Sequence, residues 1–422
     1  MSLMQCKKQI KLPIKVSSQD EPVCTVTTDV DYPAWGMWSA AWIVVAVFML
    51  SNSPTPLYAY WQQKIGFASG TLTFIFAAYI IGLITTLLFA GQLADRYGRK
   101  RLLLPGLIGA VLATLLFETA TSVTALIVAR LLTGIAVGIV VTAGMALVVD
   151  NAGPIRRSSG ALLASMAMVM GAGLGPLLAG IIYQWTPAPI TLTFSAELLI
   201  LLSAIIALIV QPVKAQPPET ERRQLRLLTV PAHSLGHVIK GIAFFGTGIS
   251  ATSFVLSLGP SMLSHILRVQ SPLIAGATAC AMFGVAVAIQ LGIKKVAVNF
   301  IFLVSGCATC AAMILFVMAL HWSSAAFLVL AALLAGAAQG AGQLGGFSLI
   351  AQHIPDNRRA EANALFNLGG YLPAGLLPII TGLVIDASSL ASGTLTLATL
   401  LGLTALMALI VVTFNRLPRS LR

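Results

Sequence analysis

Long apolar runs alternate with short polar segments along the whole chain. Each run holds about 20 residues, the length that an α-helix needs to cross the hydrocarbon core of a bilayer. The pattern therefore predicts twelve transmembrane helices. The first six cover residues 35–54, 72–91, 102–120, 123–147, 159–182 and 190–212, and the second six cover 238–258, 272–293, 298–320, 324–349, 360–384 and 391–413.

The polar segments divide the chain into five predicted parts. These are a tail (1–34), a first bundle of six helices (35–213), a linker (214–237), a second bundle (238–414) and a C-terminal tail (415–422). The bundles repeat, because a shift of 202 residues places Gly134 on Gly336 and Pro176 on Pro378. Two halves in the same orientation imply a pseudo-twofold axis along the membrane normal, with a solute path between them.

Composition and charge agree with a membrane protein. Apolar residues make up 58% of the chain and charged residues only 9%, against about 25% charged in soluble domains. The net charge of +12 could suit nucleic acid, but the 25 Lys and Arg residues fall almost entirely in the tails, the linker and alternate turns. Basic turns stay in the cytoplasm. We therefore predict a multi-pass protein of the cell membrane with both termini cytoplasmic and no nucleic-acid partner.

Other chemistry finds little support in the sequence. Cys307 and Cys310 have the spacing of a redox or metal site, but no His or acidic residue accompanies them in their helix, so a packing role is favoured. No Gly-x4-Gly-Lys-Ser/Thr loop is present, which disfavours ATP hydrolysis. The His residues fall in loops or at helix ends, which argues against an intramembrane enzyme. We expect a monomer with no cofactor, metal ion or enzymatic activity.

The most heavily charged turn joins the second and third spans. It reads Gly91-Gln-Leu-Ala-Asp-Arg-Tyr-Gly-Arg-Lys-Arg-Leu-Leu-Leu104. A turn with this much charge cannot lie in hydrocarbon, and its surplus of Arg and Lys indicates the cytoplasmic face. Without a Cβ atom, Gly91 would let a neighbouring helix approach closely and Gly98 would permit a sharp reversal.

This turn resembles the loop between the second and third helices of the major facilitator superfamily of secondary transporters. The shared positions are Gly91, Leu93, Ala94, Asp95, Arg96, Gly98, Arg99 and Lys100. A merely basic turn would account for the Arg and Lys residues but not for Asp95 and the two glycines. The resemblance implies an all-α membrane protein with twelve transmembrane helices in two pseudo-symmetric bundles of six, which works by alternating access.

The resemblance also implies a conformational latch at this turn. It brings Asp150, at the cytoplasmic end of the fourth span, beside the turn that contains Gly91 and Gly98. Asp95, Arg99 and Asp150 would then hold the outward-facing state through a charge relay that breaks when the halves rock. A static anchor for the loop is the alternative.

Arg130 is the single cation inside a span. A cation at that depth costs at least about 2.5 kcal/mol unless it faces water or a partner, so the side chain should face a cavity or a polar contact. With Gly134 four residues on, it resembles the fourth-helix motif of the proton-coupled members, although Thr133 stands where that motif often has Gln. A structural Arg that binds a helix end is the alternative.

Glu197 is the carboxylate that lies most clearly inside an apolar segment. Because burial disfavours the charged form of a carboxyl group, Glu197 is the candidate site at which a proton is taken up and released, alongside Arg130. The residue also lies near the outer end of the sixth span, where it could simply reach the lipid headgroups. Both readings stay open from the sequence.

The fifth span carries glycines at intervals of four and a proline, in the helix-packing motif Gly171, Gly175, Pro176 and Gly180. Such glycines allow close helix contact, and the proline bends the helix. The stretch is similar to the motif associated with antiporters in the superfamily, although Ala179 and Leu162 replace expected glycines. Compact packing alone would also select these residues.

Polar and aromatic residues at mid-span depth are the candidates for the substrate cavity. They are Tyr79, Gln339, Gln343, Asn367 and Tyr371. An amide in hydrocarbon needs a partner, so these residues should face the interior. Hydrogen bonding between helices is the alternative role.

Together these features predict a secondary active transporter that moves a small organic solute with protons as the coupling ion. The fifth span favours efflux by antiport. A proton symporter that imports a nutrient or metabolite would use the same Arg130 and Glu197, and it remains the alternative. A membrane-embedded receptor or enzyme without a transport cycle is the rival from another class.

Overall fold

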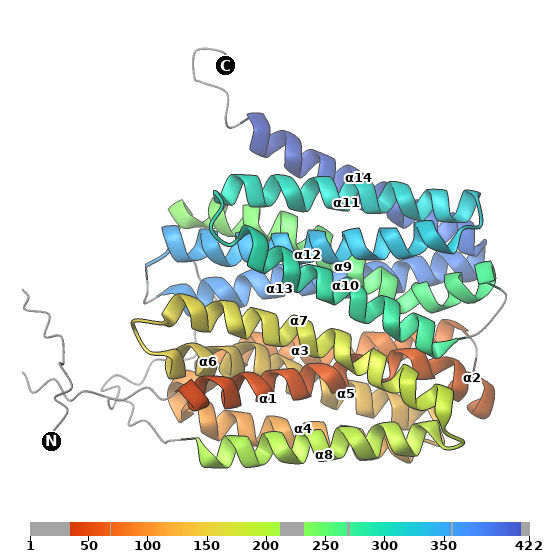
Figure 1. Cartoon of the computed structure of the whole chain (residues 1–422), viewed down its shortest axis with the longest axis horizontal. Coiled ribbons are helices and arrows are strands. Elements are labelled where there is room, and N and C mark those ends of the chain that lie inside the picture. The colour runs from red at the N-terminus through yellow and green to blue at the C-terminus, as the bar shows by residue number, and fades with distance from the viewer. Residues whose placement is uncertain (1–33, 68, 212–231, 268–270, 356–357, 415–422) are drawn as a thin grey trace, which may run out of the picture. The chain divides into compact units, whose positions relative to one another are not determined.

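The computed structural model describes residues 34–67, 69–211, 232–267, 271–355 and 358–414. These residues are almost entirely helical (Figure 1). The first half contains α1 (Ala34–Asn52), η1 (Thr55–Leu57), α2 (Tyr58–Ile65), α3 (Ser69–Tyr97), α4 (Arg99–Glu118), α5 (Val123–Ile139), η2 (Val140–Gly144), α6 (Met145–Ala152), α7 (Arg157–Trp185) and α8 (Pro189–Val210). The second half contains α9 (Ala232–Leu267), α10 (Pro272–Ile293), α11 (Val298–His321), α12 (Ala325–His353), α13 (Arg359–Ala387) and α14 (Leu390–Phe414).

Twelve of the described segments are long and apolar enough to cross a membrane, so the predicted number of spans is confirmed. Several predicted boundaries differ by a few residues or more. The largest difference is in α9, which covers Ala232–Leu267 where residues 238–258 were predicted, and α3 ends at Tyr97 where residue 91 was predicted. The predicted tails, apart from Ala34, and most of the linker lie outside the described residues. Large apolar side chains face outward from α8 and α14, where Leu199 is 69% and Met407 67% exposed. Such faces suit lipid as the solvent.

The first span is broken where the sequence places two prolines. Pro54 and Pro56 lack the backbone N–H that a continuing helix needs, and α1 ends at Asn52. The 3₁₀ turn η1 follows, and α2 then continues to Ile65. The break exposes backbone carbonyl groups at the end of α1 to side chains of neighbouring helices.

The fourth span contains a π-helical turn, η2, between α5 and α6. Thr142 Oγ1 donates toward the carbonyl oxygens of Gly138 and Ile139, each at 3.0 Å. A π-helical turn widens the backbone locally. The apolar pattern of this span contains no signal for it.

Equivalent glycines confirm the relation between the two halves. A Cβ atom added at Gly134 on α5 would meet the carbonyl oxygen of Tyr79 on α3 at 2.0 Å. A Cβ atom added at Gly336 on α12 would meet the carbonyl oxygen of Met282 on α10 at 2.0 Å. The fourth span therefore packs on the second as the tenth packs on the eighth. The predicted fold of two pseudo-symmetric halves is confirmed.

The halves meet along two pairs of helices, α7 with α10 and α3 with α13, and α7 and α10 lie side by side in Figure 1. Backbone approaches backbone in the first pair, since a Cβ atom at Gly276 would meet the carbonyl oxygen of Pro176 at 2.2 Å. In the second pair, a Cβ atom at Gly375 would meet the side chain of Ile80 at 2.2 Å. The two halves thus touch along these two helix pairs, and the space between the pairs is left for a central cavity.

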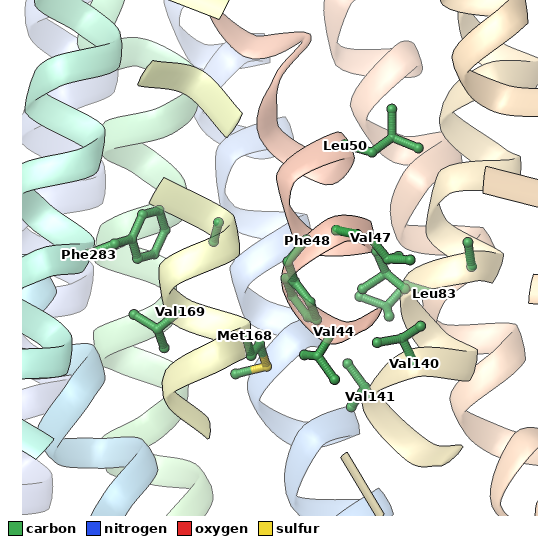
Figure 2. Close-up of a cluster of buried hydrophobic side chains, with 14 of the residues drawn as sticks. Val44, Val47, Phe48, Leu50, Leu83, Val140, Val141, Met168, Val169 and Phe283 are labelled. Carbon is green, nitrogen blue, oxygen red and sulfur yellow. The ribbon is translucent and has the colours of Figure 1, made fainter. Parts of the chain in front are cut away.

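A continuous apolar cluster surrounds α1 and extends across the α7–α10 contact. Figure 2 shows Leu83 and Val140 on one side of α1, and Val169 followed by Phe283 on the other. Phe283 belongs to the second half, yet it packs on the core of the first. The core thus holds α1 in a fixed place between α5 and α7, and this positions the residues at its broken end.

Candidate transport site

A central cavity lies between the two halves and contains about 880 Å³ of empty space, part of it open to solvent. Its walls come from α1, α3, α5 and α7 of the first half and from α9, α10, α12 and α13 of the second. Its lining is mostly apolar and aromatic with a few polar groups, which is typical of sites for small organic molecules. Its position between two halves related by symmetry is the expected position for a solute path.

Arg130 lines this cavity from α5 and is only 2% exposed. Its Nη1 atom donates to the carbonyl oxygen of Ser51 at 2.7 Å, and its Nε atom donates to the hydroxyl oxygen of Tyr58. Both acceptors lie at the break of the first span. The sequence alternatives for Arg130, a cavity contact and a contact with a helix end, are both found.

Four aromatic rings surround the guanidinium group of Arg130. The carbon atom Cζ lies 5.1 Å from the ring centroid of Tyr58, 5.3 Å from that of Phe76 and 5.8 Å from those of Tyr79 and Phe117. Cation–π attraction stabilises a desolvated cation at such distances. The rings do not accept the N–H groups in the guanidinium plane, and Nη2 has no hydrogen-bond partner among the described residues.

Glu197 lies on α8 with no exposed surface, so it does not reach the membrane surface. Its Oε1 atom contacts Ser53 Oγ, which also lies 2.8 Å from the carbonyl oxygen of Met49. Ser53 Oγ is the donor in both contacts, and its single proton serves one acceptor fully at a time. A protonated Glu197 would instead donate to Ser53 and leave the Ser53 proton to Met49.

Aromatic packing separates Glu197 from solvent. Phe194, one turn earlier on α8, stacks on Phe117 with centroids 5.2 Å apart and on Trp61 of α2 at 5.8 Å. Glu197 does not line the central cavity, whereas Asn52, the residue before Ser53, does. The end of α1 therefore lies between the carboxyl group and the cavity.

The glycines of α7 pack directly on α1 and α10. An added Cβ atom would meet the carbonyl oxygen of Val45 at 2.5 Å from Gly171 and that of Met49 at 2.1 Å from Gly175. From Gly180 it would meet the carbonyl oxygen of Pro272 at 2.6 Å. These positions accept only glycine without movement of the backbone. Gly175 also approaches the Ser53 hydroxyl group, so the motif adjoins the Glu197 contact.

The charged turn between α3 and α4 consists of one residue. Gly98 has φ +89°, which L side chains rarely adopt, and α4 starts at the next residue. Arg99 pairs with Asp150 at the end of α6, as the latch requires. A Cβ atom added at Gly91 would meet nothing within 4 Å, so the expected close approach of a helix at this glycine is wrong for this conformation. The Asp95 side chain lies outside the described residues.

Three of the five predicted cavity residues line the cavity, namely Tyr79, Gln339 and Tyr371. The other two do not. Asn367 is 5% exposed, and its Nδ2 atom donates to the carbonyl oxygen of Asn363 at 2.9 Å on its own helix. Gln343 has no exposed surface and lies instead in the contact between the halves. A 3.6-residue period gives the face of a helix but not the neighbour that covers it.

The contact that includes Gln343 is a buried polar chain that sequence reasoning missed. Ser165 Oγ of α7 donates to Oε1 of Gln290 on α10 at 3.1 Å, and Nε2 of Gln290 donates to Oε1 of Gln343 on α12 at 3.5 Å. Each of the three side chains is at most 4% exposed. The chain crosses from one half to the other beside the central cavity.

Ser51, Ser53 and Tyr58 were not predicted individually as site residues, although the interrupted segment 52–60 at the outer end of the first span indicates a gate. Each contacts Arg130 or Glu197. The run Asn52-Ser-Pro-Thr-Pro56 carries the available signal, since it predicts a helix end, and free carbonyl groups at a helix end attract buried donors.

The geometry described so far is that of a membrane transporter, with two six-helix halves and a central cavity. A model of the Major Facilitator Superfamily matches residues 40–322, which is more than half of the chain. The chain belongs to this family, and the predicted recognition is confirmed.

Similarity to individual curated relatives covers shorter stretches. The chain is 40% identical over 108 residues to the 3-(3-hydroxy-phenyl)propionate transporter of Escherichia coli (strain K12), which is 25% of this chain and 26% of that protein. It is 30% identical over 147 residues to the multidrug resistance protein MdtL of Klebsiella pneumoniae (strain 342), which is 34% of this chain and 38% of that protein. The matches thus span well under half of the relatives' length.

The solved structure of the nucleoside transporter NupG shares the fold across the chain. It superposes with a TM-score of 0.64 over 90% of this chain and 100% of its own, at 13% sequence identity. Such similarity shows the fold alone. What this member of the family transports, in which direction and with which coupling ion are matters of proposal.

Proposed function

We propose that this protein expels a small organic solute from the cell by alternating access, in exchange for protons. The basic turns and both termini then face the cytoplasm, and a single chain carries one solute path through the cell membrane. The glycine motif of α7 and the partial similarity to MdtL, a multidrug resistance protein, support the efflux direction.

One observation carries the coupling: Arg130 and Glu197 both contact the end of α1. Arg130 contacts the carbonyl oxygen of Ser51, and Glu197 contacts the hydroxyl group of Ser53 two residues on. Loss of the proton from Glu197 leaves a carboxylate that can only accept, so it competes with the carbonyl oxygen of Met49 for the single proton of Ser53. The end of α1 then shifts, and because Ser51 and Asn52 line the cavity, the shift changes the solute site.

The Arg99–Asp150 pair adds a second element that responds to the conformation. It joins the start of α4 to the end of α6 within the first half, beside the turn at Gly98. We propose that this pair forms in one state of the cycle and breaks in the other, with Asp95 as a third member. A paired charge at a moving contact favours one of two states.

The sign of proton movement tests the proposal in vesicles that contain the purified protein and a trapped pH indicator. Aromatic carboxylates, their amides and the matching amines are added outside, one at a time, without an imposed gradient. Solute that enters by exchange drives protons out, so the lumen becomes more alkaline than in protein-free vesicles. A protein-dependent acidification with every active solute contradicts antiport, and solute entry without pH change contradicts proton coupling.

Proton-driven import is the second candidate function. It is favoured by the 40% identity over 108 residues with a transporter named for 3-(3-hydroxy-phenyl)propionate. The same contacts of Arg130 and Glu197 would couple solute and proton in one direction. Acidification of the lumen in the vesicle experiment is the result that this candidate predicts.

A further inference from the structure

The central cavity has one charged residue among its described lining residues, Arg130. No Asp, Glu, Lys or His side chain lines the same walls. Glu197 does not line the cavity, since it lies behind the end of α1 and contacts Ser53. The cavity therefore presents a positive charge whose counter-ion is not supplied by the described lining residues.

The guanidinium group of Arg130 also retains hydrogen-bonding capacity. Ser51 and Tyr58 engage Nη1 and Nε, while Nη2 has no partner among the described residues. An unpaired charged donor in a dry site is costly, and a charge-assisted hydrogen bond to an anion relieves that cost. Arginine is suited to this role because its planar group matches the geometry of a carboxylate.

We propose that the solute is an organic monoanion, a monocarboxylate with an apolar body, and that its carboxylate pairs with Arg130. This inference rests on the proposed function in taking the central cavity as the transport site. A cationic solute would meet the charge of Arg130 with no described carboxylate beside it. A neutral solute would leave that charge without a counter-ion.

The side chains of the cavity walls favour an apolar, ring-containing body for this anion. Phe48, Phe76 and Phe283 line the cavity together with Ile80, Leu83 and other apolar side chains. Aromatic walls favour a flat ring through offset or edge contacts. The test therefore uses carboxylates with one or two rings.

Gln339 contributes a neutral polar side chain to the lining. It lines the opposite wall from α12 and is 4% exposed, and its Oε1 atom has no partner among the described residues. The Oε1 atom is buried in this conformation, so Gln339 offers a neutral amide to the cavity and no second positive charge. A solute with one negative charge is therefore matched by the single cation of the lining, Arg130.

Binding requires a small rearrangement, because Nη2 of Arg130 is covered by its neighbours in this conformation. The rings of Phe76 and Tyr79 lie over the guanidinium group and also line the cavity. A shift of either ring would uncover the donor. The carboxylate would then replace part of the cation–π contact with a stronger charge-assisted one.

The test measures binding to the purified full chain in detergent, by calorimetry, without a proton gradient. The panel holds one- and two-ring carboxylates, each with its amide and its amine of the same shape. We expect the tightest ligand to be a carboxylate, with its amide weaker by about 10- to 100-fold, as for loss of a charged hydrogen bond. A panel in which amides or amines bind as tightly, or in which no carboxylate binds, overturns the proposal.

Variants of Arg130 locate the contact. Arg130→Gln should remove the preference for the carboxylate over its amide, and Arg130→Lys should retain part of that preference because its charge remains without the planar geometry. Amide binding in Arg130→Gln also reports that the cavity is intact. If Arg130→Gln does not fold, the comparison of carboxylate with amide on the unaltered chain still decides the charge preference.

Failure of the solute assignment and failure of the proposed function give different results. Carboxylate binding without proton-linked flux in vesicles leaves the solute class standing and contradicts proton coupling. Proton-linked flux of an amine or amide, with no carboxylate bound, leaves the transport function standing and overturns the solute class. Equal binding by Arg130→Gln and the unaltered chain would place the anion elsewhere and overturn the assignment.

Discussion

The contact between α7 and α1 makes a sharp prediction for Gly175→Ala. The added Cβ atom would lie 2.1 Å from the carbonyl oxygen of Met49, where contacts under 3.0 Å are essentially never seen. The two backbones must separate by about 1 Å to accommodate it, and overpacking of this kind costs about 1–3 kcal/mol. The substitution is small, but both contacting groups are held by helices and cannot rotate away.

Gly109→Ala on α4 is the matched control. A Cβ atom at Gly109 would meet nothing within 4 Å, so only the intrinsic helix preference changes. That preference favours Ala over Gly by up to about 1 kcal/mol in either helix interior. The same gain applies to Gly175→Ala, so the difference between the variants isolates the close contact at about 1–3 kcal/mol.

The assay is unfolding of the purified protein in mixed micelles by titration with a denaturing detergent, with helicity as the signal. We expect Gly109→Ala to keep or raise the free energy of unfolding and Gly175→Ala to lower it relative to this control. Equal changes in the two variants would show that α1 and α7 do not approach as described. That outcome would also remove the structural support for the end of α1 as the coupling element.

Three further predictions concern the charged turn and the proton site. Gly98→Ala should lower the free energy of unfolding by about 1–3 kcal/mol, because Ala is strained at φ +89°; an unchanged value in the same titration would contradict the one-residue turn. Arg99→Asp and Asp150→Arg should each slow transport, and the double exchange should restore it. The free energy of unfolding should change by less than about 1 kcal/mol, because the pair is partly exposed. If the double exchange does not recover flux in vesicles, the latch is contradicted. Glu197→Gln should abolish the pH dependence of flux. The control is Glu118→Gln at the end of α4, where the carboxylate accepts from Ser195, and this variant should retain the pH dependence. The reverse pattern would show that Glu197 is not the proton site.

The spans could be predicted from the sequence because hydrocarbon imposes a length and an apolar composition on every helix that crosses it. The pseudo-repeat could be predicted for a similar reason. Gly134 and Gly336 occupy equivalent positions since each permits contact between two backbones. The sharp reversal at Gly98 could also be predicted, because a one-residue turn between two charged helix ends requires a backbone conformation that few residues other than glycine adopt.

The site could be predicted only in part. Arg130 and Glu197 stand out because charge is rare in an apolar run, but their shared contact with the end of α1 joins residues far apart in the chain. Gln343 and Asn367 have the same depth and polarity as Gln339, yet Gln339 alone of the three lines the cavity. Which polar side chain meets solute and which meets another helix depends on how the helices are rotated.

The sequence by itself determined that the chain lies in a lipid bilayer, and it determined the number of spans, the twofold relation of the halves and the family. Each of these follows from local composition or from motifs of adjacent residues. Only the tertiary structure decided which residues share a site. It placed Ser51 and Ser53 between Arg130 and Glu197, and it left the guanidinium group as the one charge among the described lining of the cavity. The physical reason is that burial and pairing are properties of contacts between distant segments, which no local pattern records.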